Sequence, residues 1–262
     1  MTEIRNVAKE RLEAGGLAIG VGLRQARTVD IAKIMKTAGY DFLFIDLEHS
    51  SIPLDVASQI SCAAQDAGIT PIVRVPGFEH WQAAKALDAG AQGIVVPHVD
   101  DAEQAAAMVQ HVRYPPLGRR SFGGGLPQLS FAATPAVEAT AAIDAATLLV
   151  VMIETPEAVD NVEAIAAVPG IDVLLVGTND LCLAMGIPGQ VDHPRVAAAY
   201  ERILAACRAN GRHAGLGGVY HPPLMERYLA MGFRFVLAGS DLSLMMAAAS
   251  ERAAVVRAME RR

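Results

Sequence analysis

The feature of this sequence that most constrains its fold is a repeated alternation of short apolar runs with helical patterns. The helical patterns are mostly rich in alanine, as at 28–39 and 81–90. Runs that are apolar on both faces are typical of parallel strands covered by helices. Eight strand–helix units predict closure into a (β/α)₈ TIM barrel. The predicted strands are residues 17–23, 42–48, 70–75, 93–99, 148–154, 173–180, 213–218 and 233–240.

Glycines mark the ends of several predicted helices. Gly39, Gly68, Gly90 and Gly232 each follow a helical pattern and precede a predicted strand. Glycine accepts the left-handed conformation that commonly ends a helix, so we expect these positions to be C-caps. No linker or low-complexity tract divides the chain, and α/β barrels often reach this length as one domain. We therefore expect residues 1–262 to form a single barrel domain.

Composition and charge exclude several classes of protein. The net charge of −6 and the lack of a basic cluster argue against a nucleic-acid partner. The three cysteines are an odd number without CxxC spacing, which is typical of free thiols in a reducing compartment. Residues 1–16 form a charged amphipathic helical pattern rather than a signal peptide, and no apolar stretch predicts a membrane span. We therefore expect a cytoplasmic protein without a membrane partner.

Polar residues gather where the predicted strands end, whereas the strand beginnings are mostly Gly, Ala and Thr. In barrels of this kind the carboxyl ends of the strands carry the chemistry. The asymmetry therefore indicates an enzyme. The strand-end residues are Asp46, Glu48, His49, Arg74, His98, Glu154, Asn179, Asp180, Ser240 and Asp241.

Two of these residues, Glu154 and Asp180, are carboxylates that follow consecutive predicted strands. A hard divalent cation takes oxygen ligands and keeps positions open for water or substrate. The pair therefore predicts a site for such a cation. A 2-oxo acid can chelate the ion through its carboxylate and keto oxygens, and the ion then stabilises an enolate. The alternative is that both are solvated loop acids, such as helix N-caps.

Arg74 and His49 are the other candidates for chemistry. The forked donors of Arg74 suit an oxyanion, although Arg74 could instead pair with Asp46 or Glu48 across neighbouring strands. His49 is a candidate base or water-positioning group, with a capping role as its alternative. For His98 we favour a structural or rim role.

Other enzyme classes lack their signatures. Lysines fall on predicted helices and none ends a strand, which disfavours a Schiff-base aldolase. No GxGxxG follows a strand and no Walker-type loop is present, so nucleotide binding has no support. Residues 100–147 form a long connection rich in Pro and Gly, which we expect to supply a lid or substrate-binding loop on the catalytic face. The last segment predicts a helix that packs on its own barrel or on a neighbouring subunit.

Several motifs together resemble the HpcH/HpaI family of metal-dependent (class II) pyruvate aldolases. The likeness covers nearly the whole chain, and IETxEA followed by GxxDLxxxMG is its most specific combination. The motifs are FIDLEHS (44–50), PIVRVPG (71–77), LDAGAQGIVVPHVD (87–100), RYPPLGRRSFGG (113–124), MIETPEAVDN (152–161) and VGTNDLCLAMGIPG (176–189).

The resemblance implies a TIM barrel assembled as a homohexamer, a trimer of dimers, with C-terminal helices exchanged between neighbours. It implies Mg²⁺, Mn²⁺ or Co²⁺ on Glu154 and Asp180. Arg74 would stabilise the pyruvate enolate, and His49 would move a proton. An acid corresponding to Asp88, which by itself reads as an ordinary exposed helical residue, would assist from an adjacent subunit.

The resemblance also assigns supporting roles around the site. Backbone amides near Gly177 and Thr178 would contact the pyruvate carboxylate, and Asp46, with Glu48 beside it, would support the site from behind. The chain departs from the family pattern in the loop after RYPP and in LGGVYHPP (216–223). These loops should contact the aldehyde half of the substrate, so the sequence does not identify the natural aldehyde.

The leading hypothesis is an aldolase that cleaves 4-hydroxy-2-oxo acids to pyruvate and an aldehyde. The alternative keeps the same metal–enolate site for oxaloacetate decarboxylation or cleavage of a CoA thioester. A third hypothesis, a non-catalytic binder of 2-oxo acids, predicts a missing catalytic group. Arg74, His49, Glu154 and Asp180 are all present, which favours the enzyme.

Overall fold

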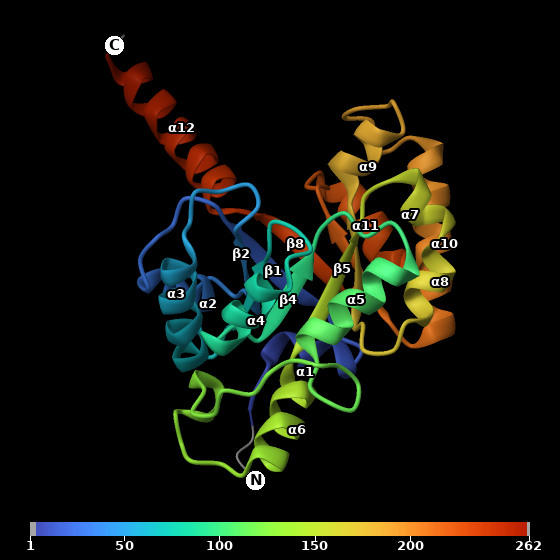
Figure 1. Cartoon of the computed structure of the whole chain (residues 1–262). Coiled ribbons are helices and arrows are strands. Elements are labelled where there is room, and N and C mark those ends of the chain that lie inside the picture. Colours follow the sequence, from blue (N-terminus) through green and yellow to red (C-terminus); the bar gives the residue numbers. More distant parts are fainter. Residues whose placement is uncertain (1–3, 261–262) are drawn as a thin grey trace.

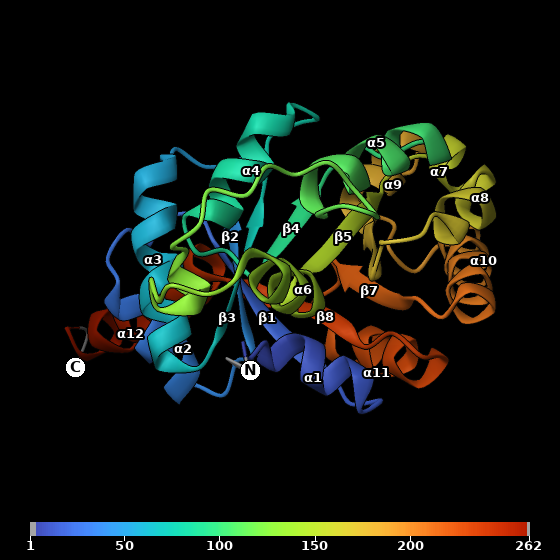
Figure 2. The same cartoon turned by 60° about the horizontal axis from the view of Figure 1, so that its bottom comes forward.

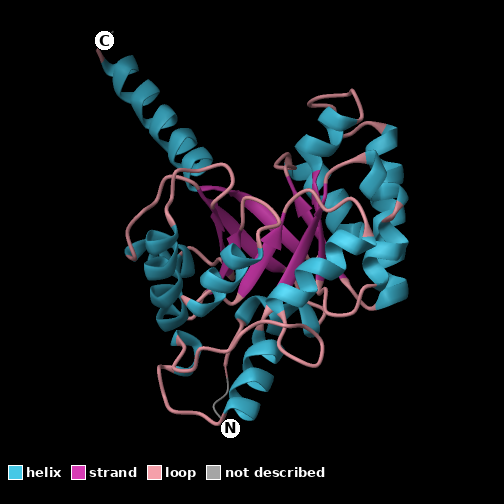
Figure 3. Ribbon diagram, in the orientation of Figure 1, coloured by secondary structure: helices cyan, strands magenta, loops and turns pink. Residues whose placement is uncertain are grey.

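Parallel strands form the centre of the protein and close into a barrel (Figures 1 and 3). The protein is described from a computed structural model over residues 4–260, and within that range the barrel has eight strands. Each strand pairs with its neighbour in the chain, and the last pairs with the first. The strands are β1 (Ala18–Leu23), β2 (Phe42–Asp46), β3 (Thr70–Arg74), β4 (Gly93–Val96), β5 (Leu148–Ile153), β6 (Val173–Gly177), β7 (His213–Gly217) and β8 (Phe235–Ser240).

The predicted (β/α)₈ barrel is thus confirmed, and a strand lies in every one of the predicted runs. One boundary was wrong in a way that matters for the site. The run 173–180 was expected to be strand throughout, but β6 ends at Gly177 and a helix starts at Thr178. Asp180 therefore lies in the first turn of that helix and not on the strand.

Helices surround the strands and cover their outer face (Figure 2). The glycines predicted to end helices all have positive φ, between 70° and 124°. Gly68 and Gly232 are C-caps as predicted, whereas Gly39 and Gly90 each lie one residue beyond the C-cap. The helices are α1 (Val7–Glu13), α2 (Asp30–Thr37), α3 (Leu54–Ala67), α4 (His80–Asp88), α5 (Ala102–Val112), the 3₁₀ helix η1 (Pro127–Leu129), α6 (Ala136–Ala146), α7 (Pro156–Asp160), α8 (Val162–Ala167), α9 (Thr178–Ala184), α10 (Pro194–Asn210), α11 (Pro222–Met231) and α12 (Asp241–Met259).

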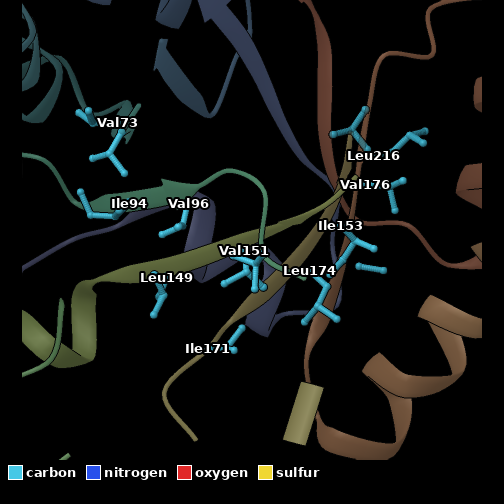
Figure 4. Close-up of a cluster of buried hydrophobic side chains, with 14 of the residues drawn as sticks. Val73, Ile94, Val96, Leu149, Val151, Ile153, Ile171, Leu174, Val176 and Leu216 are labelled. Atoms are coloured by element: carbon cyan, nitrogen blue, oxygen red, sulfur yellow. The ribbon is translucent and has the colours of Figure 1, made fainter. Parts of the chain in front are cut away.

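Two main buried clusters make up the core because strand residues alternate between the inside and the outside of the barrel. The outer cluster packs between strands and helices, and Figure 4 shows part of it, including Val151 on β5. The inner cluster contains Phe42 and Phe235, whose rings stack with centroids 4.3 Å apart. Gly20 makes room for this pair, because a Cβ there would lie 2.0 Å from the Phe42 ring. Tight packing inside the barrel holds the strand ends in place.

Helix α1 contributes to the same inner cluster through Ala8 and Leu12. Its N-cap residue Asn6 donates from Nδ2 to the carbonyl oxygens of Gln92 and Ala146, which fixes α1 against the strands. The N-terminal helix predicted over 1–16 is thus present over a shorter range, and its first three residues lie outside the described part.

The long connection between β4 and β5 differs from its prediction. It contains α5, η1 and α6, and the segment 113–135 lies at the amino-terminal end of the barrel beside α6 (Figure 1). The physical reason is that α5 runs back from the carboxyl ends of the strands to their amino ends. The segment that follows α5 therefore begins on the face opposite the active-site end. The prediction of a lid or substrate-binding loop on the catalytic face of this barrel is wrong for residues 113–135.

Helix α12 extends from the carboxyl-terminal end of β8 away from the barrel (Figures 1 and 3). It carries several exposed apolar side chains, among them Met245 and Val256, which are 56% and 54% exposed. Such a surface is normally covered in a soluble assembly. Within the described residues, no helix is both long and apolar enough to cross a membrane.

Candidate active site

A cavity of about 240 Å³ opens at the carboxyl ends of the strands. This is the end of the barrel where the sequence placed its polar residues, and every barrel strand except β4 contributes residues on it or shortly after it. Its lining residues are Gly22, Arg24, Phe44, Asp46, His49, Arg74, Met152, Gly177, Thr178, Asn179, Asp180, Gly217, Gly218, Tyr220, Leu237, Gly239, Ser240 and Ser243. Met152 adds a contribution from β5.

Arg74 lies at the buried floor of the cavity, bound to Asp46 on the neighbouring strand. Its Nε and Nη2 donate to Asp46 Oδ1 and Oδ2 at 3.0 and 2.6 Å, and its Nη1 lies 2.8 Å from Glu48 Oε2. The pairing that was the alternative for Arg74 is therefore present, with both Asp46 and Glu48. Nη1 also donates to Met152 Sδ at 3.9 Å, whereas Nη2 carries a second N–H that can face a ligand.

Asp46 holds Arg74 in position and also organises the turn after β2. Its Oδ1 accepts the backbone N–H groups of Glu48 and His49 at 3.1 and 3.0 Å. Burial opposes ionisation of Asp46, but the hydrogen bonds and charge of Arg74 and the His49 amide lower its pKa below the ordinary value. Asp46 is therefore a fixed anion that orients two functional candidates.

His49 lines the cavity with its ring half exposed, and its Nε2 lies 3.8 Å from Glu48 Oε2. The turn that follows is closed by Ser50, whose hydroxyl accepts the N–H of Ile52 at 3.1 Å. The capping function that was the alternative for His49 thus belongs to its neighbour. The ring of His49 is left available at the rim of the cavity.

Glu154 directly follows β5 and is only 2% exposed. Burial is the main reason that its pKa rises to about 7, and the nearby charge of Asp180 raises it further. The backbone N–H of His98, which donates to Glu154 Oε2 at 2.9 Å, and the charge of Arg74 act in the opposite direction. A buried carboxylate of this kind is stabilised by a bound cation.

His98 joins two of the carboxylates. Its Nε2 lies 2.8 Å from Glu48 Oε1, and its Nδ1 lies 3.4 Å from Glu154 Oε2. The backbone of His98 has φ of 55°, which is uncommon for a residue with a side chain. The expected rim position is confirmed by its 53% exposed ring, but the bridge between Glu48 and Glu154 was not foreseen.

Glu154 and Asp180 could hold a divalent cation between them. Asp180 is partly exposed in the first turn of α9 and lines the cavity. Among residues 4–260, no three His, Cys, Asp or Glu side chains converge into a closed metal site. Two carboxylates with room beside them suit a hard cation that keeps open positions for ligands. The donor set therefore fits the predicted metal.

The remaining predicted catalytic residue, Asp88, lies outside this cavity. It is near the carboxyl end of α4, 44% exposed, and its Oδ1 accepts from Arg120 Nη2 at 2.6 Å. The side chain of Arg120 is fully buried and stacks on the ring of Tyr114. The structure thus brings together every other predicted site residue and leaves Asp88 on the surface of its own barrel.

Arg24 and Tyr220 line the cavity but were not among the predicted site residues. Arg24 directly follows the first apolar run, so the strand-end rule that found Arg74 could have found it. Tyr220 lies in the 216–223 segment, whose departure from the family pattern did point to the substrate region. This segment lines the cavity, as its predicted contact with the substrate requires.

Comparisons with known proteins agree with the geometry. Residues 24–248 match the family model described as HpcH/HpaI aldolase/citrate lyase. A 4-hydroxy-4-methyl-2-oxoglutarate aldolase from Hapsidospora irregularis is 39% identical, over 99% of this chain and 98% of that protein. A hydroxypyruvate/pyruvate aldolase from Agrobacterium fabrum is 38% identical, over 91% and 88%. The crystal structure of an HpcH/HpaI aldolase from Desulfitobacterium hafniense superposes with a TM-score of 0.92 at 27% identity, covering 97% of both chains.

Proposed function

This chain belongs to the HpcH/HpaI aldolase/citrate lyase family, and from that premise we propose that it cleaves 4-hydroxy-2-oxo acids to pyruvate and an aldehyde or ketone. It is a carbon–carbon lyase, as its aldolase relatives are. The observation that carries the proposal is the common cavity of Arg74, His49 and Asp180 at the strand ends, with Glu154 buried beside it. We take the whole chain to act as one barrel domain.

The proposed cofactor is Mg²⁺, Mn²⁺ or Co²⁺ held by Glu154 and Asp180. When bound, such an ion would polarise the 2-keto oxygen and favour negative charge on it. The support for this comes from the donor set: two carboxylates, one of them buried with a raised pKa, beside a cavity that accepts small ligands.

The protein's own groups would stabilise the enolate, bind the substrate carboxylate and transfer the proton. Arg74 would donate the second N–H of its Nη2 to the developing enolate oxygen, and its buried pair with Asp46 would hold that group in position. Thr178 begins α9, where the first backbone N–H groups have no partner within the helix, so these amides and those near Gly177 suit a carboxylate. His49 would accept the proton of the 4-hydroxyl group, directly or through water.

The alternative reactions have less support. A CoA thioester would need a basic groove for its nucleotide, and the pair Arg119-Arg120 was the sequence candidate. Arg120 is instead buried against Asp88 and Tyr114, and the cavity of about 240 Å³ suits a small acid. Oxaloacetate decarboxylation would use the same groups, and a direct assay separates it from aldol cleavage.

We also propose a homo-oligomer, a hexamer built as a trimer of dimers, in which α12 packs on a neighbouring subunit. The exposed apolar side chains of α12 support this assembly. Asp88 would then act in the site of an adjacent subunit, which agrees with its exposure on its own barrel.

Release of pyruvate from 4-hydroxy-4-methyl-2-oxoglutarate and other 4-hydroxy-2-oxo acids tests the proposal, with oxaloacetate as a parallel substrate. We expect turnover to disappear in chelator and to return with Mg²⁺ or Mn²⁺. The variants Glu154→Gln and Asp180→Asn should be inactive at every metal concentration. Full activity in chelator, or turnover of oxaloacetate alone, would contradict the proposal.

A further inference from the structure

We propose that Arg24 binds a second carboxylate on the far half of the substrate, so that the preferred substrates are 4-hydroxy-2-oxo diacids. This inference rests on the proposed aldolase function and concerns the half of the substrate that the metal and Arg74 do not reach. The reaction is ordinary aldol cleavage: the 4-hydroxyl group loses its proton, and the C3–C4 bond breaks with its electrons passing to C3. C3 then takes up a proton to give pyruvate, and the far half leaves as a carbonyl compound that keeps its carboxylate.

The order of the strands gives the substrate a direction. In a closed ring of eight, β1 lies opposite β5, and β8 lies two strands from β6. Glu154 follows β5 and Asp180 follows β6, while Arg74 ends β3. A pyruvate unit held among these three groups occupies one side of the cavity. The rest of the substrate therefore extends toward the lining residues of β7, β8 and β1.

On that side of the cavity the lining side chains are mostly small and uncharged. Arg24 supplies the positive charge there. Gly217, Leu237 and Ser240 are typical of the other lining residues there. Arg24 follows β1 directly, and its side chain is 43% exposed, compared with 5% for Arg74. The two arginines thus differ in depth: one lies at the floor and the other at the open rim.

The guanidinium of Arg24 is held by one edge and leaves the other edge free. Its Nε donates to Asp46 Oδ2 at 3.1 Å. Among the described residues, Nη1 and Nη2 of Arg24 donate no hydrogen bond. Two Nη groups presented together match the two oxygens of a carboxylate. Arg24 therefore lines the cavity with the free donors that carboxylate binding requires.

The backbone that carries Arg24 is fixed by Asp241 at the start of α12. The Asp241 carboxylate accepts the N–H groups of Arg24, Gln25 and Ala26 at 2.7 to 3.2 Å and is 9% exposed. A loop tied by three such bonds holds its side chain in place before the ligand arrives, which lowers the entropic cost of binding. The site is thus preformed on both sides, by Asp46 at the guanidinium and by Asp241 at the backbone.

The test compares two substrates that differ in a single group. 4-Hydroxy-2-oxoglutarate carries a carboxylate on C4, whereas 4-hydroxy-2-oxopentanoate carries a methyl group there. We expect the wild type to prefer the diacid by about 100-fold in kcat/KM, because a site built for a polar group rejects analogues that lack it. Arg24→Gln should lower kcat/KM for the diacid about 100-fold and change the value for the monoacid by less than about 3-fold. Arg24→Lys should retain part of the preference.

Arg27 provides the matched control, because it is an exposed arginine three residues away that binds Ser51 and does not line the cavity. Arg27→Gln should leave both substrates unaffected. Since Arg24 also contacts Asp46, an equal loss for both substrates in Arg24→Gln would mean a structural role through Asp46 and Arg74, and it would overturn the inference. Absence of a diacid preference in the wild type would overturn it as well.

A binding measurement decides the inference even if the aldolase function itself fails. 2-Oxoglutarate and 2-oxopentanoate lack the 4-hydroxyl group, so they cannot be cleaved, and they differ in their distal carboxylate. With Mg²⁺ present, calorimetry should show that Arg24→Gln raises the Kd of 2-oxoglutarate at least about 10-fold and leaves 2-oxopentanoate unchanged. A wild type that releases no pyruvate but shows this pattern contradicts the proposed reaction and supports Arg24. Equal Kd changes for both ligands overturn the assignment of Arg24.

Discussion

Glu154 lies against Gly177 so closely that a Cβ added at Gly177 would be 2.3 Å from Glu154 Oε1. Glu154 directly follows β5 and Gly177 ends the neighbouring strand β6, and the missing side chain of Gly177 makes the space for the Glu154 carboxylate. The backbone of Gly177 has φ of −84°, which any residue can adopt. Glycine is therefore required here by space and not by backbone conformation.

We expect Gly177→Ala to displace the Glu154 carboxylate and to weaken Mn²⁺ binding at least about 10-fold, because metal sites depend on the orientation of each ligand. Titration of Mn²⁺ followed by electron paramagnetic resonance measures the affinity. Gly123→Ala is the control, since Gly123 is exposed and a Cβ there would have no neighbour within 4 Å. Unchanged affinity in Gly177→Ala would argue against Glu154 as a ligand.

The buried pair of Arg74 and Asp46 predicts an effect on both turnover and stability. Arg74→Ala should abolish pyruvate release but leave Mn²⁺ bound, because Arg74 is not a metal ligand in our proposal. It should also lower the free energy of unfolding by about 3 kcal/mol, since the buried Asp46 carboxylate loses two guanidinium hydrogen bonds and keeps Arg24 as its remaining cation. Arg74→Lys keeps the charge but loses the fork, so it should restore stability more than turnover.

Arg202 offers the control for the stability measurement. It pairs with Asp160 and Glu163 on the exposed surface, where ion pairs add little to stability, so Arg202→Ala should shift the urea midpoint far less than Arg74→Ala does. Retained turnover in Arg74→Ala would contradict the role of Arg74 at the enolate oxygen.

The raised pKa of Glu154 predicts a pH dependence of stability in the metal-free protein. Its pKa is about 7 in the folded protein and ordinarily 4.5, so between these values the folded state binds the proton more firmly than the unfolded state. Stability should therefore fall as the pH rises from about 4.5 to about 7, by an amount on the order of 3 kcal/mol, and then level off. Glu154→Gln should lack this contribution. Urea unfolding in chelator at several pH values measures it, and an identical pH profile in wild type and variant would contradict the raised pKa.

The proposed action of Asp88 in the site of an adjacent subunit predicts that two inactive variants can complement each other. Asp88→Asn and Glu154→Gln should each be inactive alone, but co-expressed chains should recover about a quarter of the activity if each site takes Asp88 from a neighbour and the two chains mix at random. The control is a mixture of Glu154→Gln with Asp180→Asn, both of which affect the same site of one barrel. That mixture should stay inactive. No recovery in the first mixture would remove Asp88 from the proposed site.

Strand-end reasoning predicted much of the site because it depends on local patterns. Arg74 and Glu154 both follow apolar runs directly, and a parallel barrel brings such positions to one face. Arg24 obeys the same rule and was nevertheless missed. Asp180 was assigned to a strand although it lies in the first turn of a helix, because an apolar run does not show where hydrogen bonding changes from sheet to helix. The segment 113–135 was misplaced because its composition indicates a loop without indicating the face of the barrel.

The sequence by itself determined the barrel, the glycine caps and the set of polar strand ends, since each depends on the order and periodicity of nearby residues. Only the tertiary structure decided which side chains share partners. It placed Arg24 and Arg74 on the same Asp46, linked Glu48 to Glu154 through His98, and left Asp88 on the outside. These contacts depend on closure of the ring and on side-chain burial, which bring together residues from different strands that no local pattern relates.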